Sequence, residues 1–299
     1  MADEPTNDLE LILPAGFREN LSEAERRLLR AAPKGELAVC GPNADDKAPA
    51  NDPAKADGWG SEREIRADLI RWLCVDQEAS RRIDARGVRV YGAKVTGELD
   101  LSVVVVPFPL SLSRCRLIAD CNLQYLKIVA LYLDGSFTRS VNADGTDVRG
   151  SVFFRNGFSA RGEVRLSSAQ IGGVLDCDGG SFKNPSGLAL NADGAEVRGY
   201  VFLRHASAEG EVILLRARIG NNLECDGGEF RNPNGRALNA DSAEIIGNVF
   251  LGYGFSADGE VSLVEAKIEG SLDCTDAVFR NRSGYALNAI RAEIKGEFF

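Results

Sequence analysis

A short motif of alternating apolar residues around a glycine recurs along this chain and constrains its fold more than any other feature. One version ends in cysteine and returns after 48 and then 49 residues, and a sister version ending in Leu or Phe lies between its copies. From Thr146 onward, successive copies begin 22 to 26 residues apart. An internal repeat of this period indicates a stacked-repeat architecture. The cysteine copies are Ala169–Cys177, Ala217–Cys225 and Ala266–Cys274.

The residues between the apolar positions of the motif are Lys, Glu, Arg, Asp or Ser. An alternation of period two places successive side chains on opposite faces of a strand, so each copy has an apolar face that is buried (the dry face) and a polar face that contacts solvent (the wet face). A unit of about 24 residues cannot bury its dry face alone, whereas stacked units share a continuous core. The copies should therefore lie above one another with Ile171, Ile219 and Ile268 pointing into one interior.

These constraints predict an all-β solenoid. Because parallel strands are joined by right-handed crossovers, we expect a right-handed parallel β-helix of quadrilateral-like section with roughly nine coils. A leucine-rich horseshoe is disfavoured because its Leu-x-x-Leu-x-Leu frame is missing. We assign residues 87–299 to this repeat domain and residues 1–86 to an N-terminal helical segment with a linker and a cap helix.

Two capping boxes mark helices in the N-terminal segment. Ser22-Glu-Ala-Glu25 predicts a helix from Glu23 to Ala32. Ser61-Glu-Arg-Glu64, followed by the apolar stripe of Ile65, Leu69 and Leu73, predicts an amphipathic helix of about 13 residues. An uncovered solenoid end exposes apolar surface and strand edges, so we interpret this second helix as an N-terminal cap. The Pro- and Ala-rich stretch from Pro33 to Gly58 is predicted to be a mobile linker.

The formal net charge of −9 disfavours a protein that holds nucleic acid through phosphate contacts, because such proteins need a basic face. We therefore expect no direct nucleic-acid binding, while a DNA mimic or a basic partner protein stays compatible with the charge. No signal peptide and no apolar run of 18 residues is present, which predicts a cytoplasmic location. Seven cysteines in such a protein predict free thiols.

The repeat continues to Phe298 and Phe299 in mid-motif. We expect the last coil to be covered either by further chain or by another subunit. Stacking of two last coils about a two-fold axis is one solution, so the sequence predicts a homo-oligomer formed through this coil.

Residues 59–299 resemble a widespread bacterial family. The resemblance is carried by Trp59–Cys74, by Gly87–Ala93 and by the Gly-Glu-Val and Leu-Asp-Cys repeats. The family consists of pentapeptide-repeat-like β-helix proteins, often labelled "membrane-associated oxidoreductase". Longer members continue into a C-terminal membrane segment, so the resemblance implies membrane contact only through such a part and a place at the periphery of the inner membrane.

A looser likeness is to the pentapeptide-repeat proteins that mimic DNA and shield gyrase. This chain departs from their pattern, because its coil is about 24 residues rather than about 20 and the five-residue frame is degenerate.

Cysteines and carboxylates form the candidate ladders of the solenoid. Cys177, Cys225 and Cys274 occupy inward positions two coils apart, about 10 Å, which is too far to share a zinc ion with Zn–S bonds near 2.3 Å. We interpret them as buried core residues. The carboxylates are candidate interaction ladders on the wet faces: Asp176, Glu224 and Asp273, and Glu163, Glu211 and Glu260.

No dinucleotide-binding fingerprint, P-loop, His-Glu-x-x-His or Cys-x-x-Cys is present. We therefore assign no catalytic residue, no cofactor and no metal ligand. The leading hypothesis is a non-catalytic β-helical scaffold whose acidic faces bind a protein partner. The alternatives are a DNA-mimicking inhibitor of a nucleic-acid enzyme and, from the family label, a membrane-associated oxidoreductase.

Overall fold

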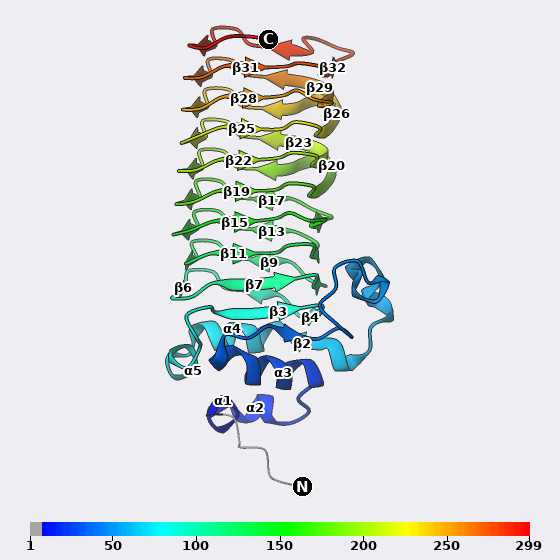
Figure 1. The fold of residues 1–299 in the computed structure, drawn as a ribbon, viewed down its shortest axis with the longest axis vertical. Coiled ribbons are helices and arrows are strands. Elements are labelled where there is room, and N and C mark those ends of the chain that lie inside the picture. The colour runs from blue at the N-terminus through cyan, green and yellow to red at the C-terminus, as the bar shows by residue number, and fades with distance from the viewer. Residues whose placement is uncertain (1–7) are drawn as a thin grey trace.

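The computed structural model describes residues 8–299 and is a parallel β-solenoid with short helices over its N-terminal end (Figure 1). Three sheets run along its length, and all pairings between their strands are parallel. Sheet C contributes one strand to each turn and has nine strands, so the solenoid has about nine turns. The predicted all-β solenoid with an α-helical N-terminal cap is confirmed.

Sheets A and C each form one side of the solenoid. Sheet A consists of β1 (Ala38–Val39), β3 (Val88–Tyr91), β7 (Leu110–Ser113), β11 (Leu131–Tyr132), β15 (Val152–Phe153), β19 (Leu175–Asp176), β22 (Val201–Phe202), β25 (Leu223–Glu224), β28 (Val249–Phe250) and β31 (Leu272–Asp273). Sheet C consists of β6 (Val105–Val106), β10 (Lys127–Ile128), β14 (Asp147–Val148), β18 (Gln170–Ile171), β21 (Glu196–Val197), β24 (Arg218–Ile219), β27 (Glu244–Ile245), β30 (Lys267–Ile268) and β34 (Glu293–Ile294).

Sheet B contributes two strands to each of the first four turns, which gives those turns a quadrilateral-like section. One set is β2 (Glu64–Arg66), β4 (Lys94–Thr96), β8 (Arg116–Leu117), β12 (Phe137–Thr138) and β16 (Ser159–Ala160); the other is β5 (Leu99–Asp100), β9 (Cys121–Asn122), β13 (Val141–Asn142) and β17 (Val164–Arg165). The two sets merge in β20 (Ser181–Asn191), β23 (Ser207–Ile213), β26 (Glu229–Asn239) and β29 (Ser256–Ser262), and separate again in β32 (Val278–Arg280) and β33 (Leu287–Asn288).

One continuous apolar core fills the solenoid, as the alternation predicts. Ile171, Ile219 and Ile268 are each 1% exposed and lie in register along sheet C. Phenylalanine rings pack inside, with the centroids of Phe154 and Phe158 of one turn 4.9 Å apart and those of Phe158 and Phe182 of the next turn 5.7 Å apart. Burial of this stripe supplies the main driving force for stacking the turns.

Long and short turns alternate in the second half of the solenoid. The turn from Arg218 to Glu244 contains the 11-residue β26, whereas the turn from Glu196 to Arg218 contains the seven-residue β23 and advances by only 22 residues. A long turn advances by 26 residues, and the next short turn by 23. A long and a short turn together give the 48- and 49-residue spacing of the cysteines.

A side-chain hydrogen bond closes each protruding loop of the long turns. The amide of Asn232 donates to the carbonyl of Arg236 at 2.8 Å, and Asn184 does the same to Leu188 at 2.9 Å. The short turns pass beneath these loops through a glycine. Gly210 and Gly259 have φ of +117° and +135°, and an added Cβ would lie 2.3 Å and 2.4 Å from the carbonyl oxygens of Asn184 and Asn232. Only glycine fits there without moving the loop.

Helices α1 (Asp8–Ile12), α2 (Ala15–Arg18), α3 (Glu23–Ala31), α4 (Ala67–Val75) and α5 (Gln77–Arg81) lie at the N-terminal end. In α3 the Ser22 hydroxyl accepts from the Glu25 amide and Glu25 caps the Ser22 amide, so the first capping box is confirmed. The Glu25 carboxylate, which is 2% exposed, also binds Arg66, with Oε1 2.7 Å from Nε. This partly buried ion pair joins α3 to the strand that precedes α4.

The second capping box is wrong. Ser61–Arg63 is a 3-10 turn, Glu64–Arg66 is strand β2, and the helix begins at Ala67. Ile65 pairs in register with Val95 of the first turn. Parallel pairing with the solenoid therefore overrides the local helix signal at these residues. The apolar face of α4 still covers the first turn.

The stretch from Pro33 to Gly58 is not a mobile linker. It contains strand β1, which pairs with β3, and two 3-10 helices, Pro49–Asn51 and Pro53–Gly58. The Arg63 guanidinium fastens it by donating to the carbonyls of Ala50 and Gly92 at 2.8 Å and 2.6 Å. Its Asn51 side chain is fully buried and donates to three acceptors of the same segment.

The last turn exposes large apolar side chains, among them Tyr285 and Phe299, and Phe298 begins a further rung by pairing with Leu272. Association of two chains through this turn stays a prediction. Across residues 8–299, every helix is too short or too polar to cross a lipid bilayer.

Candidate functional site

Acidic and aromatic side chains alternate on the outer face of sheet A. The register of the sheet places them on successive turns in one column, here called the aromatic–acidic column. A second column runs beside it two residues further along each turn, here called the arginine column. The aromatic–acidic column is Tyr132, Phe153, Asp176, Phe202, Glu224, Phe250 and Asp273, and the arginine column is Asp134, Arg155, Asp178, Arg204, Asp226, Gly252 and Thr275.

Arg155 lies over the ring of Phe153 and between two carboxylates. Its guanidinium carbon is 4.3 Å from the ring centroid, and its nitrogens lie 3.1 Å from Asp134 of the preceding turn and 2.9 Å from Asp176 of the following turn. Burial lowers the pKa of Arg155, but the two carboxylates outweigh it and the net pKa is raised. Asp134 is itself partly buried, which raises the pKa of its carboxyl against the pull of Arg155.

Arg204 repeats this arrangement two turns later. Its guanidinium carbon is 4.5 Å from the centroid of Phe202, its Nε donates to Asp178 at 2.8 Å, and its Nη1 lies 3.3 Å from Glu224. The hydrogen bond to Asp178 raises the pKa of the Arg204 guanidinium. The same three partners, namely a ring, an acid of the preceding turn and an acid of the following turn, therefore hold both guanidinium groups.

The ladder of Asp176, Glu224 and Asp273 thus has two kinds of member. Asp176 and Glu224 each bind an arginine of this chain. Asp273 accepts the Thr275 amide at 2.8 Å and has no cationic partner among residues 8–299. Aromatic side chains separate the three acids along the column, so the acids do not form a continuous acidic stripe.

Asparagines of this chain bind the second acidic ladder. Glu163, Glu211 and Glu260 each accept a hydrogen bond from an asparagine amide of the next long turn, at 3.3, 3.4 and 2.9 Å respectively. Burial raises the pKa of Glu211, and the bond from Asn239 opposes this shift. These carboxylates are half-buried, and their hydrogen bonds to the asparagines help to hold successive turns together.

The outer face of sheet C is close to charge balance. Its outward column alternates in sign near the middle, where Arg218 lies 2.8 Å from Glu196 and 3.6 Å from Glu244 on the turns before and after it. Exposed ion pairs of this kind contribute little to stability, about 0.2–1 kcal/mol each. They do reduce the net negative charge that this face presents.

The cysteine ladder lies inside sheet A. Cys177 and Cys225 are fully buried, Cys274 is partly exposed, and Leu203 and Leu251 lie between them. All three are free thiols, and burial raises each pKa, for Cys274 to about 11. Among residues 8–299, no three His, Cys, Asp or Glu side chains gather closely enough to hold a metal ion.

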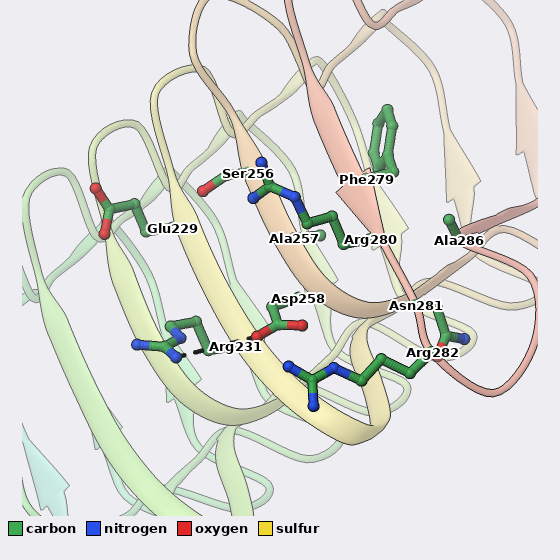
Figure 2. Close-up of a pocket in the computed structure, with 10 residues that line it drawn as sticks. All are labelled: Glu229, Arg231, Ser256, Ala257, Asp258, Phe279, Arg280, Asn281, Arg282 and Ala286. Atoms are coloured by element: carbon green, nitrogen blue, oxygen red, sulfur yellow. Dashed lines mark ion pairs between the residues drawn. The ribbon is translucent and has the colours of Figure 1, made fainter.

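A groove of about 560 Å³ lies over the short turn that contains β29, next to the loop that follows β32, and Figure 2 shows the residues that line it. Arg231, Asp258 and Arg280 project from its floor on successive turns in strand register. Arg231 and Asp258 lie 4.0 Å apart. The groove exists because the short turn lacks the loop that the long turns carry, and its lining mixes cations and anions.

Sequence reasoning missed the arginine column and the outward phenylalanines. The signal was present in the sister motif, which reads Val152-Phe-Phe-Arg155, Val201-Phe-Leu-Arg204 and Val249-Phe-Leu-Gly252. The last copy replaces the arginine with glycine.

Comparison of the chain with protein-family models, with curated proteins and with solved structures finds no match.

Proposed function

We propose that this protein is a non-catalytic β-solenoid scaffold that binds a protein partner through the outer face of sheet A. The observation that carries the proposal is the aromatic–acidic column, in which half-buried Phe rings alternate with carboxylates from Phe153 to Asp273. Aromatic residues and arginine are the side chains enriched in protein interfaces and in their hot spots. A stack of rigid turns presents these side chains without an ordering penalty on binding.

Membership of the pentapeptide-repeat-like family is part of this proposal and is supported by the repeat motifs and by the stacked parallel turns. The DNA-mimic alternative has weaker support, because asparagines and arginines of this chain bind Glu163, Glu211, Asp176 and Glu224. It predicts salt-sensitive inhibition of a topoisomerase or nuclease. The oxidoreductase alternative is a prediction from the resemblance alone.

Affinity capture with matched variants tests the scaffold proposal. Tyr200→Ser/Phe202→Ser alters the outer face of sheet A, whose rings stack with centroids 5.1 Å apart, and Gln170→Ser/Lys267→Ser alters the outer face of sheet C. Quantitative mass spectrometry should find a protein that wild type and the sheet C variant retain and that the sheet A variant loses. An identical set of captured proteins for all three baits would contradict the proposal.

A further inference from the structure

The arginine column is interrupted at one position where its surroundings are preserved. Gly252 replaces the arginine that the two earlier copies carry at positions 155 and 204, while Phe250, Asp226 and Asp273 keep the ring and both acids. These three residues are here called the Phe250 site. Asp226 and Asp273 have no ion pair within residues 8–299, unlike Asp178 and Asp176 at the equivalent positions.

Backbone hydrogen bonds hold both carboxylates of the Phe250 site in the same pose as their counterparts. Oδ1 of Asp226 accepts the Gly252 amide at 2.9 Å, as Oδ1 of Asp178 accepts the Arg204 amide at 3.0 Å. In the Arg204 copy the other oxygen, Oδ2 of Asp178, receives the guanidinium. The second oxygen of Asp226 is therefore directed toward the same place beside the ring.

A backbone amide also holds the acid of the following turn in the same pose as its counterpart. Oδ1 of Asp273 accepts the Thr275 amide at 2.8 Å, and Oδ1 of Asp176 accepts the Asp178 amide at 3.1 Å. Oδ2 of Asp176 binds Nη1 of an arginine at 2.9 Å. Residues 8–299 thus use this constellation twice for an arginine guanidinium and leave it once without a cation.

We propose that the Phe250 site binds an arginine side chain of a basic partner protein. A planar guanidinium on the Phe250 ring would donate to Oδ2 of Asp226 on one side and to Oδ2 of Asp273 on the other, as Arg155 and Arg204 do in their own copies. Two uncompensated carboxylates favour a cation, and the ring with two flanking acceptors favours the fork of arginine over the point charge of lysine. Tyr253 follows Gly252 and is 64% exposed, so it can contact the partner backbone.

The inference rests on the proposed function, yet its test needs no partner. The probe is acetyl-Gly-Arg-Gly-amide, titrated into the isotope-labelled full chain while the backbone amide resonances of Gly252 and Thr275 are followed. The expected result is saturable binding in roughly the millimolar range, weaker binding of the lysine peptide, and no binding of the neutral citrulline peptide.

Asp226→Asn/Asp273→Asn is the decisive variant, because asparagine Oδ1 still accepts the Gly252 and Thr275 amides while the charge is lost. This variant should bind the arginine peptide about tenfold more weakly, or weaker still. Asp147→Asn/Glu229→Gln removes the same charge from sheets C and B and should leave the affinity unchanged. Equal binding of the citrulline or lysine peptide, wild-type affinity of the decisive variant, or no shift at Gly252 would each overturn the inference.

The two proposals fail separately. If the arginine peptide does not bind but capture of the partner depends on sheet A, only the arginine site is overturned. If the arginine peptide binds as expected but no captured protein depends on sheet A, only the scaffold function is overturned.

Discussion

Replacing Gly259 with alanine tests why long and short turns alternate. Gly259 has φ of +135°, and a Cβ there would lie 2.4 Å from the Asn232 carbonyl oxygen and 3.0 Å from the Gly235 oxygen. The backbone conformation alone costs an alanine about 1–3 kcal/mol. The contact adds about 1–3 kcal/mol, since the loop must move as in other overpacked sites. We expect Gly259→Ala to lower the free energy of unfolding by about 2–6 kcal/mol.

Gly254→Ala is the matched control. Gly254 also has a positive φ, +92°, but nothing lies within 4 Å of its added Cβ. Gly254→Ala should lower the free energy of unfolding only by the conformational contribution, about 1–3 kcal/mol. Urea unfolding followed by circular dichroism gives both values from the shift of the midpoint at constant slope. Equal losses in the two variants would refute the reasoning, because the loop of the long turn would then exert no steric demand on the short turn.

Three further outcomes are expected. Arg204→Gly should expose Phe202 between Asp178 and Glu224 and raise the number of arginine-peptide sites from one to two in the same titration. The partly exposed Cys274 should be the first of the ladder thiols to react with a disulfide reagent, and Cys177 and Cys225 should stay unreactive until the protein unfolds. Because burial raises the pKa of Cys274 to about 11, its reaction rate should rise about tenfold per pH unit from pH 8 to 10 as the thiolate forms. Glu25→Gln should weaken the charge-assisted bonds to Arg66 by about 2 kcal/mol and speed hydrogen exchange in α3 and α4, with unchanged exchange in sheet C.

The repeat unit was predictable from the sequence because its core obeys a local rule. Alternation of apolar residues assigns Ile171, Ile219 and Ile268 to the interior without knowledge of any neighbour, and the structure buries all three. The first capping box succeeds for the same reason, since Ser22 and Glu25 satisfy each other within one helical turn. Such signals involve residues close in sequence, so the chain alone determines them.

The surface could not be predicted in this way. Ser61 and Glu64 have the spacing of a capping box, but pairing with Lys94 and its neighbours places Glu64 in a strand. Arg155 meets Asp134 and Asp176, which lie one turn before and one turn after it. An alignment of like copies of the motif compares residues that lie two turns apart and leaves out the residues of the turn between them. The acids were therefore grouped with each other, although Asp176 contacts an arginine of a neighbouring turn.

A two-turn period has an electrostatic consequence that a one-turn period lacks. Neighbouring turns lie about 4.8 Å apart, and two like charges at that distance repel by about 0.9 kcal/mol in water and about 3.5 kcal/mol at an effective dielectric of 20. Identical turns would stack each outward acid on another acid, whereas alternating turns place Asp178 against Arg204. Gly252 breaks this alternation on the outer face of sheet A, and there the carboxylates of Asp226 and Asp273 flank Phe250 with no cationic partner among residues 8–299. A cation supplied by a partner restores the local balance, and for that reason we expect the surface of sheet A that the partner covers to include this turn.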